Sequence, residues 1–190
     1  GLGIIQISSL SDEDFELHIG HRKIIIKGKD KIYDYLKENH FPRKRQRYIV
    51  QQRIALATIK NNPFDIRVMV QRKKNSLEWK VTGKLAKVAA NNFVVTNAAK
   101  AILSVEYAIG ISLVNNEKIK DVVADLEEVS LLIAGQLAKS YTNKRVYGID
   151  LGIDVEGKVW IIEANLTPAV SMFKFLNDGS YETINAYKRG

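Results

Sequence analysis

Three oxygen-bearing side chains near the end of the chain have the types and spacing of a divalent-cation site. Glu163 and Asn165 are two residues apart, so on an extended strand both side chains leave the same face. Asp150 precedes Glu163 by thirteen residues, and an antiparallel hairpin would bring the two carboxylates opposite each other. Two carboxylates and an amide oxygen suit Mg²⁺, a hard cation that takes oxygen ligands and keeps positions for water and phosphate oxygens.

A β-hairpin is the element that must position these three residues. Residues 147–153 and 158–165 are rich in Val, Ile and Trp, which is typical of strands, and the Asp-Val-Glu-Gly sequence at 154–157 has turn chemistry. Because Glu163 follows the apolar run Trp-Ile-Ile, we expect this acid to be buried. An edge hairpin with solvated acids is the alternative, and it leaves unexplained why acids interrupt two apolar runs at facing ends.

A second group of polar residues lies on a predicted strand at 64–70. Apolar and polar residues alternate there, which places Asp65 and Arg67 on one face. The planar, permanently charged fork of Arg67 is suited to bidentate binding of phosphate oxygens. A cross-strand salt bridge is the alternative for the same pattern. A further strand is predicted at 79–89, and a long helix with one apolar stripe at 117–141, which we expect to pack behind the sheet of the hairpin.

Length and composition describe one domain, or two small lobes that share a core. The chain has 190 residues, of which 46% are hydrophobic and 26% charged, and no apolar run approaches the roughly 20 residues of a membrane span. It contains no cysteine, which excludes disulfides, thiolate metal sites and a cysteine nucleophile, and fits a cytoplasmic protein.

The net charge of +8 is unevenly distributed. Residues 22–100 hold 20 Lys and Arg against 5 Asp and Glu, a net of +15, whereas the remaining residues hold 9 against 16, a net of −7. A basic part and an acidic, metal-holding part together suit a polyanion such as a nucleotide. Charge alone leaves nucleic acid and an acidic polymer as other partners.

The acidic hairpin motif resembles the metal signature of the ATP-grasp enzymes, and the Asp-x-Arg-Val sequence that begins at Asp65 resembles another segment of that family. Within it, the resemblance is greatest to the endospore coat-associated YheC/YheD group, covers essentially the whole chain and implies an α+β fold. Two lobes, each with an antiparallel sheet and flanking helices, would hold ATP between them. We expect the smaller lobe and hinge at about 1–52, the larger lobe at about 53–190, and a chain that begins inside the family's glycine-rich loop.

The resemblance also implies roles for individual residues. Mg²⁺ would be held by Asp150, Glu163 and Asn165, and the transferring phosphoryl group would be stabilised by Arg67 and Lys87, where relatives usually have Arg at the second position. The residues implied in nucleotide binding are Gly1 and Gly3 of the loop, Gln51 and Gln52 of a linker at 47–56 that we expect to begin as a buried strand, Asp65, and Ile162 as a wall of the adenine pocket.

The implied activity is ATP-dependent ligation of a carboxylate to an amine or similar nucleophile through an acyl phosphate, in association with a spore coat. Lys87 in place of Arg, and Ala98 and Ala99 where relatives have glycines, favour an alternative: a catalytically degenerate nucleotide-binding or structural coat protein. A nucleic-acid module built on residues 43–53 is a third and weaker hypothesis, because this basic segment lacks the interleaved aromatics of a stacking platform. The expected partners are therefore ATP, an unidentified carboxylate and amine, and spore-coat components, without a membrane.

Overall fold

The computed structural model describes residues 4–20, 22–40, 48–90 and 99–189. The described residues up to Arg53 form one compact unit, and those from Ile54 onward form a larger one. Both units combine antiparallel sheet with helix, so the predicted α+β class is confirmed. None of the described helices is both long and apolar enough to span a membrane.

The smaller unit is a three-stranded antiparallel sheet with one helix. Its elements are β1 (Ile5–Ser9), β2 (Asp14–Ile19), β3 (Arg22–Lys27) and α1 (Lys29–Asn39). The central strand β2 supplies the buried Phe15 and Leu17, which pack with Ile32 of α1. This small core follows from alternation on β2, which turns every second side chain toward the helix.

The larger unit is built on a six-stranded antiparallel sheet. Five strands lie in the order β7-β6-β5-β8-β9, and the short β4 pairs with β5. Their bounds are β4 (Thr58–Ile59), β5 (Asn62–Gln71), β6 (Lys80–Ala89), β7 (Ala99–Leu103), β8 (Val146–Ile153) and β9 (Val159–Asn165). The predicted hairpin is thus β8 and β9, with β9 at the edge of the sheet and β8 beside the central β5.

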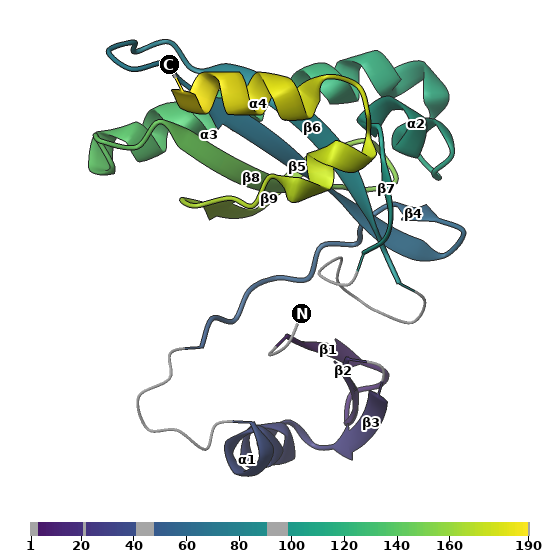
Figure 1. Cartoon of the computed structure of the whole chain (residues 1–190). Coiled ribbons are helices and arrows are strands. Elements are labelled where there is room, and N and C mark those ends of the chain that lie inside the picture. Colours follow the sequence, from purple (N-terminus) through teal and green to yellow (C-terminus); the bar gives the residue numbers. More distant parts are fainter. Residues whose placement is uncertain (1–3, 21, 41–47, 91–98, 190) are drawn as a thin grey trace. The chain divides into compact units, whose positions relative to one another are not determined.

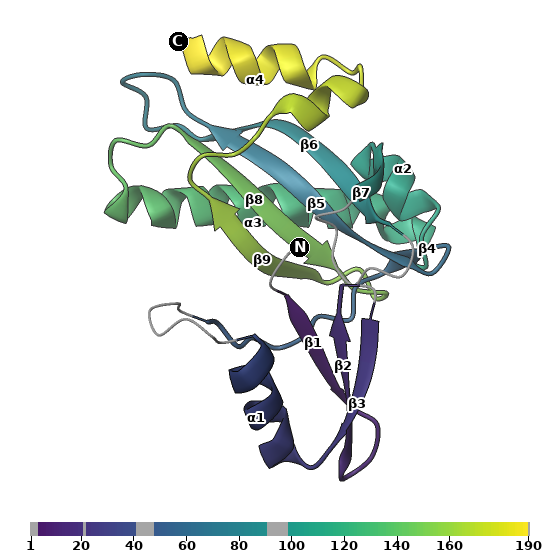
Figure 2. The ribbon, with the colours of Figure 1, turned by 60° about the horizontal axis from the view of Figure 1, so that its bottom comes forward.

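Helices cover both faces of this sheet (Figures 1 and 2). They are α2 (Val105–Gly110), α3 (Ile119–Ser140) and α4 (Ser180–Arg189), with short 3-10 helices η1 (Asn116–Lys118) and η2 (Ser171–Phe175). The apolar stripe of α3, including the buried Val122, Leu126 and Ala134, packs on one face of β5 and β8. The prediction that this helix lies behind the hairpin sheet is confirmed.

Strand β5 divides its side chains between the two faces. Phe64, Ile66, Val68 and Val70 join the main core on the α3 side. Met69 faces the other way, into a smaller core with Leu85, Phe173 of η2 and Ile184 of α4. Asp65 and Arg67 lie on the same face as Met69 but outside this smaller core, and they belong to the site described below.

The segment before the larger sheet differs from prediction. Residues 48–50 were expected to form a buried strand, but they are irregular and exposed: Ile49 is 88% and Val50 99% accessible. A β-branched apolar run favours an extended backbone, yet a strand requires hydrogen bonds to a neighbouring strand. The described sheets, with orders β1-β2-β3 and β7-β6-β5-β8-β9, pair no strand with this run.

Candidate functional site

The β8–β9 hairpin brings the three predicted metal ligands to one face of the sheet. Asp150 pairs with Glu163, and Asn165 pairs with Gly148, two residues before Asp150. The turn is organised by Asp154, whose Oδ1 accepts hydrogen bonds from the backbone N–H groups of Glu156 and Lys158, each at 3.0 Å. The side chain of one turn residue thereby sets the register on which the site depends.

A β-bulge next to the site shifts the register within β9. Asp150 pairs with Glu163, but Leu151 pairs with Ile161, so Ile162 is the extra residue of the edge strand. Its Cδ1 lies 3.5 Å from the position that a Cβ on Gly152 would occupy. Ile162 is therefore beside the Asp150 strand, where an apolar wall was expected. Its contact with adenine stays a prediction.

Asp150 is the centre of a buried charged cluster. Its Oδ1 accepts from Arg67 Nε at 2.6 Å and from Lys87 Nζ at 3.3 Å. Its Oδ2 accepts from Arg67 Nη2 at 2.7 Å and from Asn165 Nδ2 at 3.2 Å. Arg67 and Asp150 are direct neighbours across β5 and β8, which is why the guanidinium fork meets the carboxylate in bidentate geometry.

Lys87 connects this carboxylate to a second one. Its Nζ lies 3.0 Å from Asp65 Oδ1, and Asp65 and Lys87 are paired across β5 and β6. Asp65, Arg67, Lys87 and Asp150 are each less than a tenth exposed. Two positive and two negative charges balance within this quartet, which is how four ionised groups can be buried together.

Burial and pairing act in opposite directions on the ionisation of this cluster. Burial raises the pKa of Asp150, but the hydrogen bond from Arg67 and the charge of Lys87 outweigh it, so the pKa lies below its ordinary value. Burial likewise lowers the pKa of Arg67, and the bond to Asp150 outweighs it and keeps that pKa above its ordinary value. The Arg67–Asp150 pair is therefore ionised at neutral pH.

Glu163 is exposed, contrary to the expectation that it is buried. The reason is its place on β9, the edge strand of the sheet, which has no described strand on its outer side to cover it. Glu163 Oε1 accepts from Asn165 Nδ2 at 2.9 Å, so one amide group joins the exposed carboxylate to the buried Asp150. The neutral quartet thus opens to solvent through Glu163 and Asn165.

The donor set fits a hard divalent cation under one condition. A carboxylate offers about four lone-pair positions, and the four contacts of Asp150 occupy them all. Rotation of the Asn165 amide by half a turn would present its oxygen in place of its nitrogen and release one position on Asp150 Oδ2. Glu163, Asn165 and Asp150 then offer three oxygens at a place whose net charge is −1. Among the described residues, no group of three or more Asp, Glu, His and Cys side chains forms a metal site.

The remaining predicted residues are Gly1, Gly3, Gln51 and Gln52. Gly1 and Gly3 lie outside the described residues. Gln51 and Gln52 are exposed and irregular in structure, just before the larger unit. No described contact joins Gln51 or Gln52 to the charged cluster, and their part in nucleotide binding stays a prediction.

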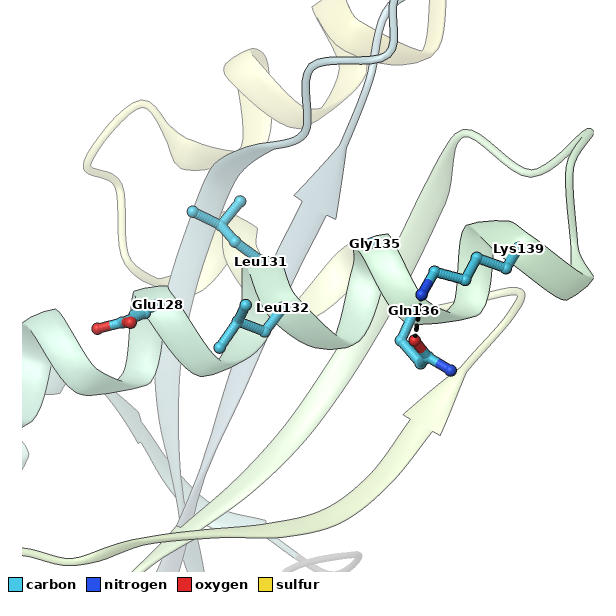
Figure 3. A pocket seen from close by; sticks show the side chains of 6 residues that line it. All are labelled: Glu128, Leu131, Leu132, Gly135, Gln136 and Lys139. Carbon is cyan, nitrogen blue, oxygen red and sulfur yellow. Dashed lines mark hydrogen bonds between the residues drawn. The ribbon is translucent and has the colours of Figure 1, made fainter.

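A hollow of about 680 Å³ lies away from this cluster, on the outer side of α3 (Figure 3). All six residues that line it belong to that one helix: Glu128, Leu131, Leu132, Gly135, Gln136 and Lys139. A single helix cannot surround a ligand, whereas binding sites bury most of the ligand surface. The charged cluster is the better candidate for chemistry.

Two glycines were missed by sequence reasoning. Gly148 and Gly152 flank Asp150 on the same face of β8, and Pro168 and Leu56 lie over them: a Cβ on Gly148 would be 2.5 Å from Pro168 Cβ, and one on Gly152 would be 2.4 Å from Leu56 Cδ2. The Gly-x-Asp-x-Gly spacing within a predicted strand was the available signal, because glycine inside a strand often marks close approach of another segment.

Comparisons with known proteins agree with this fold. The endospore coat-associated protein YheD of Bacillus subtilis (strain 168) is 27% identical over 137 residues, which are 68% of this chain and 28% of that protein. The crystal structure of the C-terminal domain of K. lactis Pby1, an ATP-grasp enzyme interacting with the mRNA decapping enzyme Dcp2, matches with a TM-score of 0.55 and 17% identity, over 92% of this chain and 54% of that one. At that identity the likeness shows the fold alone. The family model for YheC/D-like ATP-grasp proteins matches residues 1–188, and the chain therefore belongs to the YheC/D-like ATP-grasp family.

Proposed function

We propose that this chain is the Mg·ATP-binding part of an ATP-dependent carboxylate–amine ligase. Membership of an ATP-grasp family supports ATP binding. The observation on which the proposal rests is the charge-balanced quartet around Asp150, which opens to solvent at an acid and an amide, Glu163 and Asn165. A buried cluster without net charge, next to the exposed carboxylate of Glu163, favours a divalent cation bound together with phosphates.

The proposed reaction has two steps. A carboxylate oxygen of the substrate attacks the γ-phosphorus of ATP, ADP leaves, and an acyl phosphate forms. The amine nitrogen of the second substrate then attacks the acyl carbon, inorganic phosphate leaves, and the nitrogen loses one proton, to the departing phosphate or to solvent, as the amide forms. When bound, Mg²⁺ supplies charge neutralisation for the phosphate oxygens, and Glu163, Asn165 and Asp150 would hold it.

Arg67 and Lys87 are suited to the phosphoryl group even though both are paired. The bond to Asp150 uses two of the five N–H donors of Arg67, so the guanidinium can keep its partner and still donate to a phosphate oxygen. Lys87 contacts Asp65 and Asp150 and has three N–H donors, which leaves one for the same purpose. Because ion pairs already fix the N–H donors of Arg67 and Lys87 in position, these donors need no reorganisation when charge develops on the phosphate.

The alternative is a nucleotide-binding or structural protein without turnover. It is favoured by the same pairing, because Arg67 and Lys87 lie within a buried, balanced cluster and Lys87 replaces a bidentate arginine by a point charge. The two functions differ in one observable. A ligase consumes ATP when the right carboxylate and amine are supplied, and a degenerate protein binds ATP and leaves it intact.

Association with a spore coat and a cytoplasmic origin are also part of the proposal. The coat association is supported by the name of the relative YheD, an endospore coat-associated protein. The match covers 28% of that relative, and the donor and acceptor substrates and the coat components are still to be identified.

The experiment is calorimetric titration of this chain with a non-hydrolysable ATP analogue, with and without Mg²⁺. We expect Mg²⁺-dependent binding that Glu163→Gln weakens at least about tenfold, because the variant loses one charged ligand. Glu156→Gln is the matched control: it removes an exposed acid of the same hairpin outside the site. The proposed metal–nucleotide site would be refuted if the affinity for the analogue were the same with and without Mg²⁺, or if both variants lost affinity equally.

A further inference from the structure

The chain after β9 folds back onto the site through one proline. Pro168 lies over Gly148, the residue that pairs with Asn165 and precedes Asp150 by two positions. Lys144 Nζ donates to the carbonyl oxygen of Leu166 at 3.2 Å, so this returning segment is held from a second side. The segment therefore has a defined position beside the charged cluster.

Arg67 passes over the same glycine. A Cβ on Gly148 would lie 2.5 Å and 3.3 Å from Cβ and Cγ of Pro168 and 3.4 Å from Cδ of Arg67. Arg67 Cδ carries the Nε that donates to Asp150 Oδ1 at 2.6 Å. The proline ring and the arginine stem thus border the same point above Gly148, and on the arginine this point lies a single bond before the hydrogen-bonding fork.

We propose that Pro168 is a positioning residue that holds the Arg67 fork on Asp150, and that Gly148 provides the space in which it does so. Arginine has several rotatable bonds, so its stem needs a packing partner if the fork is to stay in one bidentate geometry. Asn165, the last residue of β9 and three positions before Pro168, donates to the other carboxylate oxygen of Asp150.

The geometry allows a compensating pair of substitutions. Gly148→Ala places a methyl 2.5 Å from Pro168 Cβ, so the proline must move away from position 148 and leave its place beside the arginine stem. Pro168→Gly removes the ring and leaves the stem without its partner. In the double variant the methyl added at position 148 has room, and it would lie 3.4 Å from Arg67 Cδ, an ordinary van der Waals contact that replaces the lost one.

The test is hydrogen exchange of the Arg67 Nε–H signal in ¹⁵N-resolved NMR, with the signal assigned by its absence in Arg67→Lys. We expect exchange to be faster by about tenfold or more in Gly148→Ala and in Pro168→Gly, and to return toward the wild-type rate in the double variant. Gly83→Ala is the matched control. Its methyl would lie 2.9 Å from Ile184 Cδ1 and 3.0 Å from Phe173 Cε1, a comparable clash on the same sheet beneath α4.

The proposal is overturned by wild-type exchange in both single variants, by equal acceleration in Gly83→Ala, or by a double variant no slower than the singles. Pro168→Gly keeps the test decisive if Gly148→Ala does not fold, because it adds no heavy atom and so creates no clash. A second arm rests on the proposed function and measures affinity for the Mg²⁺-loaded ATP analogue in the same variants, where the same order is expected. Absence of binding by the wild type would refute the proposed function, and the exchange rates would still decide the role of Pro168.

Discussion

The substitution Asp150→Asn tests how strongly the larger unit depends on a satisfied charge cluster. It keeps the shape of the side chain but removes its charge and turns one acceptor into a donor that faces Arg67. Among the described residues, Arg67 and Lys87 would then share only Asp65 as a nearby buried counter-charge. Removing one partner of a buried ion pair typically costs about 3–5 kcal/mol, because the other charge stays desolvated.

That loss is a large part of the free energy of unfolding, which is about 5–15 kcal/mol for typical domains. With a urea dependence of about 2 kcal/mol per molar, the unfolding midpoint should fall by on the order of 1.5–2.5 M. The two tryptophans of the chain, Trp79 and Trp160, both lie in the larger unit, so their fluorescence follows its unfolding specifically. Glu78→Gln is the control in the same unit, since its ion pair with Lys80 is more than half exposed and should contribute less than about 1 kcal/mol.

A double-mutant cycle with Arg67→Met separates the ion pair from general damage. We expect the Arg67→Met, Asp150→Asn double variant to be more stable than the sum of the single losses by at least about 1 kcal/mol, because it leaves no unpaired guanidinium behind. Additivity within about 0.5 kcal/mol, or a midpoint for Asp150→Asn close to that of the wild type, would refute the reasoning.

Three further predictions concern the larger unit. Because the pKa of Asp150 is lower in the folded than in the unfolded chain, the stability that its ionised form contributes should be complete above about pH 4 and be lost as the pH falls further toward the folded pKa. When urea midpoints are measured against pH, the midpoint of Asp150→Asn should therefore fall less steeply at acid pH than that of the wild type. Asp154→Ala should cost about 1–3 kcal/mol and alter the emission of Trp160, whose Nε1 donates to Asp154 Oδ2 at 2.9 Å; unchanged emission would contradict this contact. Lys84→Met should cost about 1 kcal/mol in low salt and less in about 1 M NaCl, since Lys84 Nζ lies 2.6 Å from Glu127 Oε1 in a half-buried pair; a loss independent of salt would indicate packing instead.

Much of the fold was predictable because local patterns and tertiary packing agree. Alternation at 64–70 places Asp65 and Arg67 on one face, and β5 has them there. The turn chemistry of Asp154 and Gly157, with Gly157 at φ +86°, joins two strands in the predicted hairpin. The strand prediction was wrong at Ile49 and Val50, because a segment with strand propensity but no neighbouring strand cannot form the backbone hydrogen bonds of a sheet.

The sequence predicted which residues belong to the candidate site, but not which of them form ion pairs with each other. Arg67 was expected at phosphate and Asp150 at metal, whereas the structure joins the two in a bidentate pair and adds Lys87 and Asp65. Residues 83 positions apart in the chain meet only through the order in which strands assemble, and no local pattern encodes that order. The metal and phosphate roles of these residues stay predictions.

The sequence by itself determined the residue types of the site, the hairpin that presents them and the family to which the chain belongs, because these depend on neighbours within a few residues or on a motif. Tertiary structure alone decided that Asp150 is buried among two cations while Glu163 remains exposed. The physical reason is position in the sheet, since β8 lies between two strands and β9 lies at the edge. The carboxylates of Asp150 and Glu163, on adjacent strands, therefore differ in their exposure to water and in the charges that surround them.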